Sequence, residues 1–149
     1  FWLMGDLGQS AQWWPAFVAL AAALLLTMPF ARELNLLSRG LMQAQALGVA
    51  VGRLRYAIYL LASVATAASV TTAGSIGFVG LVVPHLVRLA TGNDQRLLLP
   101  ASVLAGGSLL VLADTLARTL IAPQQLPVGV LTALIGVPVF LFLLSRQPK

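Results

Sequence analysis

The chain has 149 residues, of which 59% are hydrophobic and only 9% charged, and its mean hydropathy is +0.93. Soluble domains carry about 25% charged residues, so most of this chain is expected to lie in lipid. The net charge of +5 comes from basic residues scattered between apolar runs, which is typical of membrane loops and argues against nucleic-acid binding. The absence of cysteine excludes thiolate metal sites, disulfides and thiol nucleophiles.

Four stretches without Asp, Glu, Lys or Arg can each hold a membrane-spanning helix of roughly 20 residues. One of them, residues 56–87, is too long for a single span, and the sequence TAGSIGFVG in its middle (residues 72–80) indicates a turn between two helices. We therefore expect an all-α, polytopic membrane bundle of about five helices. In chain order, the expected spans cover residues 12–31, 55–73, 76–91, 97–117 and 126–145.

The distribution of basic residues supports five spans. With Phe1 outside, five spans place eight of the nine basic residues in the cytoplasm and leave only Arg118 outside, as the positive-inside rule favours. Four spans would move Arg146 and Lys149 to the outside and weaken this bias. Because the chain starts at Phe1 without an initiating Met, a basic n-region or a cleavage site, we expect a fragment of a longer protein and not a signal peptide.

The longest interruption between spans is residues 32–54, which we expect to form a cytoplasmic loop. Its apolar residues recur near helical spacing, which predicts a short amphipathic element. Asn35 is a candidate cap for its start, Gly40 marks a break between two small helices, and Gly48 is a candidate end. Such an element lies on the membrane surface or docks a cytoplasmic partner, and the residues alone slightly favour the membrane surface.

Enzymatic activity is not expected from these residues. A P-loop needs a Lys after glycine-rich backbone, and the only Lys is Lys149, so the chain itself should not hydrolyse ATP. An intramembrane serine protease would pair Ser75 with the single His85, but Ser75 fits a turn, and a single His is usually a packed or hydrogen-bonded residue. His85 alone cannot form a metal site without Cys or clustered carboxylates.

Asp114 and Arg118 lie four residues apart at the outer end of the fourth expected span. This spacing puts them on one helix face, where they can pair with each other. Half of an ion-coupled secondary transporter is an alternative function, and such proteins usually need buried carboxylates. Asp114 lies near the end of a span, which argues against that alternative.

The segment LNLLSRGLMQAQALG (residues 34–48) resembles the cytoplasmic loop of the FecCD permeases, the BtuC-like family that imports vitamin B12, iron siderophores and haem as type II ABC importers. The resemblance implies that residues 1–149 form a single transmembrane domain, the C-terminal half of a ten-helix permease, containing its spans six to ten. Further stretches resemble the same family in the same order: FWLMG (1–5), GSIGFVGLVVPH (74–85), LADTLAR (112–118), LPVG (126–129) and GVPVF (136–140).

The resemblance also implies roles for particular residues. Arg118 matches an arginine that contacts an acidic residue of the periplasmic binding protein. Arg39 and Leu41 depart from the family pattern, which often has an apolar residue before the glycine at Gly40 and an acidic one after it. Coupling to the ATPase subunit is assigned to Asn35, Leu37, Gly40, Ala44, Leu47 and Gly48. A turn and close helix packing near the translocation path are assigned to Gly74, Gly77, Gly80 and Pro84.

The function implied by the resemblance is that of the permease subunit of an ABC importer for a metal chelate, namely an iron siderophore, haem or cobalamin, in the bacterial inner membrane. The implied partners are ATPase subunits that carry ATP and Mg²⁺, a periplasmic substrate-binding protein and a second permease protomer, identical or different. No cofactor is expected on this chain. The residues leave open which chelate is carried and what His85 does. Half of a secondary transporter and a purely structural membrane subunit stay as alternatives.

Overall fold

The computed structural model describes residues 12–120 and 127–145. Within these ranges every regular element is a helix, as expected for an all-α membrane bundle. The elements in chain order are α1 (Trp14–Thr27), the 3-10 turn η1 (Met28–Phe30), α2 (Ala31–Leu37), α3 (Leu41–Ala46), α4 (Val51–Ala73), α5 (Val79–Thr91), α6 (Gln95–Leu120) and α7 (Val128–Ser145).

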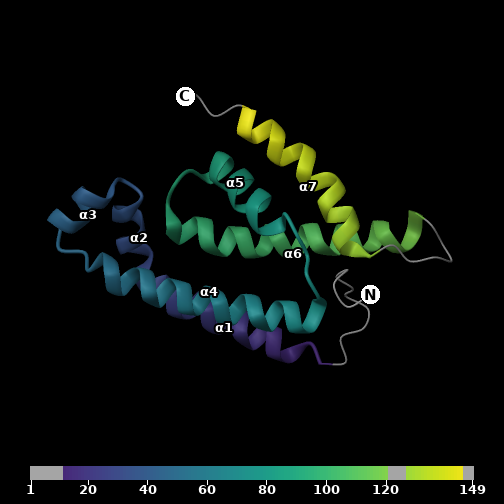
Figure 1. The fold of residues 1–149 in the computed structure, drawn as a ribbon, viewed down its shortest axis with the longest axis horizontal. Helices are drawn as coiled ribbons and strands as arrows, with labels where there is room; N and C mark the ends of the chain where they lie inside the picture. Colours follow the sequence, from purple (N-terminus) through teal and green to yellow (C-terminus); the bar gives the residue numbers. More distant parts are fainter. Residues whose placement is uncertain (1–11, 121–126, 146–149) are drawn as a thin grey trace.

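The helices form two groups (Figure 1). In one group α1 packs along α4, and in the other α5, α6 and α7 pack against one another. The short helices α2 and α3 lie at one end of the structure, next to the start of α4. We count α2 and α3 with α1 and α4, because they connect these two helices along the chain. Among the described residues, the largest contact between this group and the group of α5, α6 and α7 is that of α2 with α6. The loop between α1 and α4 therefore touches both groups.

Small residues allow the closest helix contacts. Ala113 and Ala117 of α6 are almost fully buried against Val128 at the start of α7. The large apolar side chains of α1 are instead exposed, and the helix has no buried residue in the described structure. Such surface is unfavourable in water but costs little against lipid or against further protein. This distribution agrees with a membrane domain.

The five expected spans all correspond to helices, with shifted ends. The second begins at Val51 and the third at Val79, instead of at residues 55 and 76. Three helices in the described ranges are long and apolar enough to cross a membrane, namely Trp14–Leu37, Val51–Ala73 and Gln95–Thr119, whereas Val79–Thr91 and Val128–Leu143 are shorter apolar helices.

Some residues used for the topology prediction cannot be compared with the structure. Phe1, Leu126, Arg146 and Lys149 lie outside the described residues. The side of the membrane assigned to each end of the bundle therefore stays a prediction.

The predicted turn between the second and third spans is present and is strained. Gly74 ends α4 with φ +72°, and Phe78 precedes α5 with φ +66°, in the left-handed region that non-glycine residues rarely adopt. This explains why α5 starts later than expected. A Cβ atom on Gly136 of α7 would overlap the Cβ of Phe78, so the absence of a side chain at Gly136 allows α7 to approach the turn.

The predicted close packing around Gly77 and Gly80 near the translocation path is not made by the described residues and stays a prediction. A Cβ atom at either position would meet no described atom within 4 Å. Gly80 and Pro84 both lie inside α5 and not in the turn. The close approach to the turn is made by Gly136, because that residue faces Phe78 across the α5–α7 contact.

Candidate functional site

The loop between α1 and α4 consists of two short helices separated at Gly40, as predicted. Gly40 has φ +130°, and its carbonyl accepts a hydrogen bond from the backbone N–H of Ala44 at 3.1 Å. A side chain at this φ would strain the backbone. Gly40 thus ends the connection from α2 and serves as the N-cap of α3.

The end of α3 at Gly48 is also as predicted. Gly48 has φ +82°, its N–H donates to the carbonyl of Gln45 at 2.9 Å, and the N–H of Val49 donates to the carbonyl of Ala44 at 3.0 Å. This pair of hydrogen bonds is the Schellman motif, which satisfies carbonyls that have no partner within the helix. The loop is therefore a defined structure with glycine at both turns.

The burial of the loop residues divides them by role. Ala44, predicted to contact the ATPase, is fully buried within the chain, so it holds the loop together and offers no surface to a partner. Leu37 is half-buried at the end of α2. Met42 is 84% exposed and Leu47 66% exposed. The outer surface of the loop thus carries large apolar side chains beside exposed polar ones such as Arg39 and Gln43. Met42 is a residue that the sequence analysis did not single out.

Asn35 does not cap the start of the loop, and this prediction was wrong. It lies inside α2 and caps a different helix, α6. Its Nδ2 donates to Oδ1 of Asp94 at 2.8 Å, and its Oδ1 accepts from the backbone N–H of Gln95 at 2.8 Å. The first N–H groups of a helix have no partner within that helix, so Asn35 supplies an acceptor to α6 from another element.

Asp94 is the N-cap residue of α6. Its Oδ1 accepts from the backbone N–H of Arg96 at 3.1 Å, and its own carbonyl accepts from the N–H of Leu98 at 2.8 Å. The hydrogen bond from Asn35, followed by that from the backbone N–H of Arg96, lowers the pKa of Asp94 below its usual value. Desolvation acts in the opposite direction, and the positive charge of Arg96 makes a smaller contribution that again lowers the pKa. Asp before a helix is a recognisable cap signal, but its partner Asn35 is 59 residues away.

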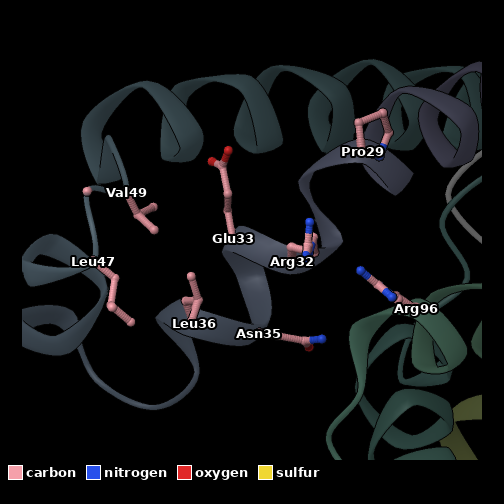
Figure 2. A pocket seen from close by; sticks show the side chains of 9 residues that line it. Pro29, Arg32, Glu33, Asn35, Leu36, Leu47, Val49 and Arg96 are labelled. Atoms are coloured by element: carbon pink, nitrogen blue, oxygen red, sulfur yellow. The ribbon is translucent and has the colours of Figure 1, made fainter.

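A cavity of about 600 Å³ lies beside this pair. Figure 2 shows Arg32 of α2 and Arg96 of α6 extending toward the same space, with Asn35 between the two helices. Leucine and valine side chains form the other wall. The lining residues are Pro29, Arg32, Glu33, Asn35, Leu36, Leu47, Gly48, Val49 and Arg96. The loop, α2 and the first turn of α6 therefore meet around one hollow.

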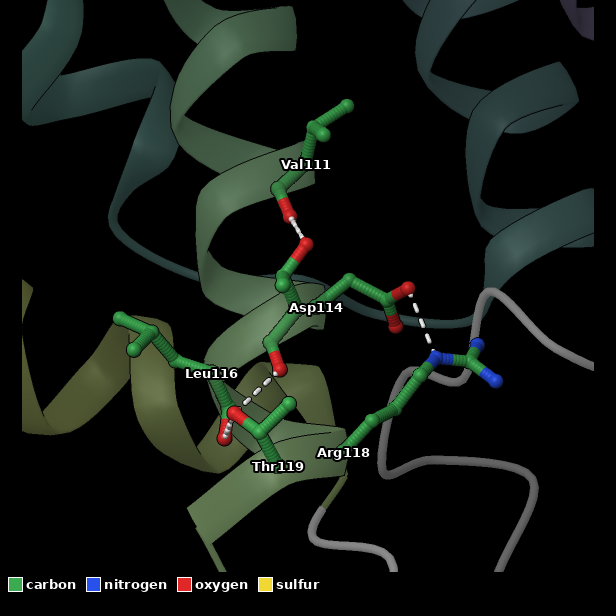
Figure 3. Close-up of polar contacts among 6 residues, drawn as sticks. Val111, Asp114, Leu116, Arg118 and Thr119 are labelled. Carbon is green, nitrogen blue, oxygen red and sulfur yellow. Dashed lines mark hydrogen bonds and ion pairs between the residues drawn. The ribbon is translucent and has the colours of Figure 1, made fainter.

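Asp114 and Arg118 form the expected ion pair near the other end of α6. Nε of Arg118 donates to Oδ2 of Asp114 at 2.8 Å, and the Arg118 side chain is 40% exposed. Figure 3 shows the pair on the outside of α6. Thr119 on the same turn bonds the carbonyls of Thr115 and Leu116. Arg118 is thus held by its own helix and is accessible from solvent.

Ser75 and His85 occupy different parts of the fold. Ser75 lies in the turn before α5, whereas His85 is half-buried in the second turn of that helix. In the part of the chain that the structure describes, no three His, Asp or Glu side chains lie together as metal ligands.

Comparison with known proteins agrees with this arrangement. The model of the FecCD transport family matches residues 1–146. The chain belongs to the FecCD transport family. It is 50% identical to the hemin transport system permease protein HmuU of Yersinia pestis over 98% of this chain, and 48% identical to the cobalamin import system permease protein BtuC of Halobacterium salinarum over 99%. Membership of this transport family, together with the apolar helices, indicates a multi-pass membrane protein.

The fold also matches a solved structure, which was reported as an inward-facing conformation of a metal-chelate type ABC transporter. The two are 37% identical with a TM-score of 0.88 over 99% of this chain. This chain covers 48% of that chain, and 44% of HmuU and 40% of BtuC. It therefore spans less than half the length of the relatives that it matches.

Proposed function

We propose that this chain is the C-terminal half of the permease subunit of an ABC importer that carries a metal chelate across the bacterial inner membrane. The observation that carries the proposal is the family match over residues 1–146. The relatives named for hemin, cobalamin and ferric dicitrate transport support an iron or cobalt chelate as the substrate class. A second permease protomer, ATPase subunits and a periplasmic binding protein complete the proposed transporter.

In this proposal the loop of α2 and α3 docks the ATPase. The exposed side chains of Met42 and Leu47 suit a cleft of the partner, because apolar side chains gain most when an interface removes them from water. Gly40 and Gly48 hold the loop in shape, and Ala44 packs it from within. This loop lies in the cytoplasm, and ATP with Mg²⁺ binds on the partner subunit.

The opposite end of α6 faces the binding protein. Arg118 is 40% exposed there and ion-paired with Asp114, and in this proposal its guanidinium also contacts a carboxylate of the binding protein. ATP binding closes the ATPase pair, shifts the loop and favours one orientation of the substrate path over the other. The chain performs no covalent step.

The test is transport by the complete permease reconstituted with its ATPase and binding protein in lipid vesicles. We expect uptake of one of hemin, cobalamin or ferric dicitrate that needs ATP and the binding protein. Uptake driven by a proton or sodium gradient without ATP would contradict the proposal and favour the secondary transporter. Binding of the three compounds to the cognate binding protein identifies the substrate directly.

A further inference from the structure

The two helix groups of the described structure are held together mainly where α2 meets α6. Besides the chain connection through residues 74–78, the other contacts between the groups are smaller. The polar part of the α2–α6 contact is the hydrogen-bonded pair of Asn35 and Asp94. A movement of the loop relative to α5, α6 and α7 must therefore displace this pair or carry α6 with it.

The pair fixes the orientation of α2 on α6 because Asn35 uses both ends of its amide. Nδ2 of Asn35 bonds the cap residue Asp94, and Oδ1 bonds the N–H of Gln95, the first residue of α6. Reversing the amide would place two acceptors together and two donors together, so the network determines its orientation. Asp94 in turn bonds the N–H of Arg96. The side chains of Asn35 and Asp94 thus accept from the N–H groups of the first two residues of α6, Gln95 and Arg96.

α6 connects this pair with the other end of the structure. The helix has 26 residues, which at about 1.5 Å per residue corresponds to a length of about 39 Å. Asp114 and Arg118 lie near its far end. α6 is one continuous helix from Gln95 to Leu120, although Pro100 removes one of its internal hydrogen bonds. A movement of the whole helix that starts at its first turn therefore also moves Arg118.

We infer that Asn35 and Asp94 form the joint through which α6 follows the ATPase-docking loop, so that Asn35 positions α6 and does not itself bind the ATPase. The inference rests on the proposed importer function. It explains why Asn35 faces α6 while Met42 and Leu47 face outward. The joint couples loop movement to the helix that carries Arg118, whereas α3 and α4 transmit the same movement to the other helix group.

Exchanging the two residues tests the joint. In the wild type, Nδ2 of Asn35 donates to Oδ1 of Asp94 at 2.8 Å. In Asn35→Asp this bond is replaced by two carboxylates that repel each other, so the joint opens. The double variant Asn35→Asp/Asp94→Asn restores the contact between the two side chains with the roles reversed, because the amide introduced at position 94 then donates to the carboxylate introduced at position 35. That carboxylate still accepts from the N–H of Gln95. The bond from the N–H of Arg96 is given up, because Oδ1 of Asp94 accepts from both Asn35 and Arg96. Asn35→Ala removes the side chain without adding charge. Asn93→Asp adds the same charge to the neighbouring exposed position and serves as the matched control.

The measured quantity is the number of ATP molecules hydrolysed per chelate imported, in the complete transporter with hemin, cobalamin or ferric dicitrate as substrate. We expect this ratio to rise roughly fivefold or more in Asn35→Asp and Asn35→Ala, as for loss of a typical coupling between sites. The exchanged double variant should bring the ratio most of the way back to that of the wild type, because the bond between α2 and α6 is restored, and Asn93→Asp should keep the wild-type ratio. A joint that only stabilised the fold would change the yield of complex and leave the ratio unchanged.

Three outcomes would overturn the inference. These are a wild-type ratio in Asn35→Asp, no recovery in the double variant, or failure of both single variants to assemble with the ATPase, which would make the pair an assembly contact. Failure of the proposed function is seen separately, because the wild-type transporter would then show no ATP-dependent uptake at all.

Discussion

Replacing Gly136 with Ala should destabilise the contact between α5 and α7. The new Cβ would overlap the Cβ of Phe78 and lie 3.0 Å from its Cγ. The Cβ of Phe78 is attached to the backbone and cannot rotate away, and its φ of +66° leaves the turn little freedom to adjust. Either α7 moves away from the turn or the turn unfolds locally.

The size of the effect follows from two opposing terms. Overpacking of this kind costs about 1–3 kcal/mol, and the rigid partner places Gly136→Ala in the upper half of that range. Ala is favoured over Gly inside a helix by about 1 kcal/mol, which offsets part of the cost. The expected net loss is about 1–2 kcal/mol. Gly107→Ala is the matched control, since a Cβ there meets no described atom within 4 Å.

The assay is thermal unfolding of the complete permease in detergent, followed by the fraction that stays monodisperse. Gly136→Ala should unfold at a lower temperature than the wild type, and Gly107→Ala should not. In a Phe78→Gly background the cost of Gly136→Ala should disappear, because the overlapping atom is gone. Equal stability of the two alanine variants, or an unchanged cost without the Phe78 side chain, would refute the packing described here.

Four further predictions concern the two ends of the bundle. A cysteine introduced at Gln43 should resist a membrane-impermeant thiol reagent added to intact cells, and its labelling from outside would reverse the topology. Met42→Asp should lower retention of the ATPase on purification, because it puts a charge into an apolar interface; full retention would remove the loop from that interface. Arg118→Glu should slow association of the binding protein, most strongly at low salt, and unchanged affinity would leave only its pairing with Asp114. Folding lowers the pKa of Asp94, so its charged carboxylate stabilises the fold at pH values above its ordinary pKa of 3.8. This stabilisation is lost as the pH falls through the lowered pKa. Asp94→Asn should therefore be less stable than the wild type at neutral pH and equal to it in acid, as measured by thermal unfolding across that range.

The sequence alone was sufficient for the features that depend on neighbouring residues. The apolar runs predict the helices, since a backbone in lipid must satisfy its hydrogen bonds within each segment. Gly40 and Gly48 marked the two turns of the loop, because their positive φ is a local requirement that glycine meets at little cost. The pair of Asp114 and Arg118 follows from helical spacing in the same way.

Only the tertiary structure decided which distant residues meet. Asn35 looked like a cap for its own helix, yet it caps α6, because the packing of α2 on α6 brings it to unpaired N–H groups 60 residues away. Ala44 matched a docking residue, but the fold of the short loop buries it. Phe78 meets Gly136 only because α7 crosses the turn before α5. Local sequence patterns determine the conformation of each segment. Contacts between segments depend on how the helices pack, and the spacing of apolar residues along the chain does not specify which helices meet.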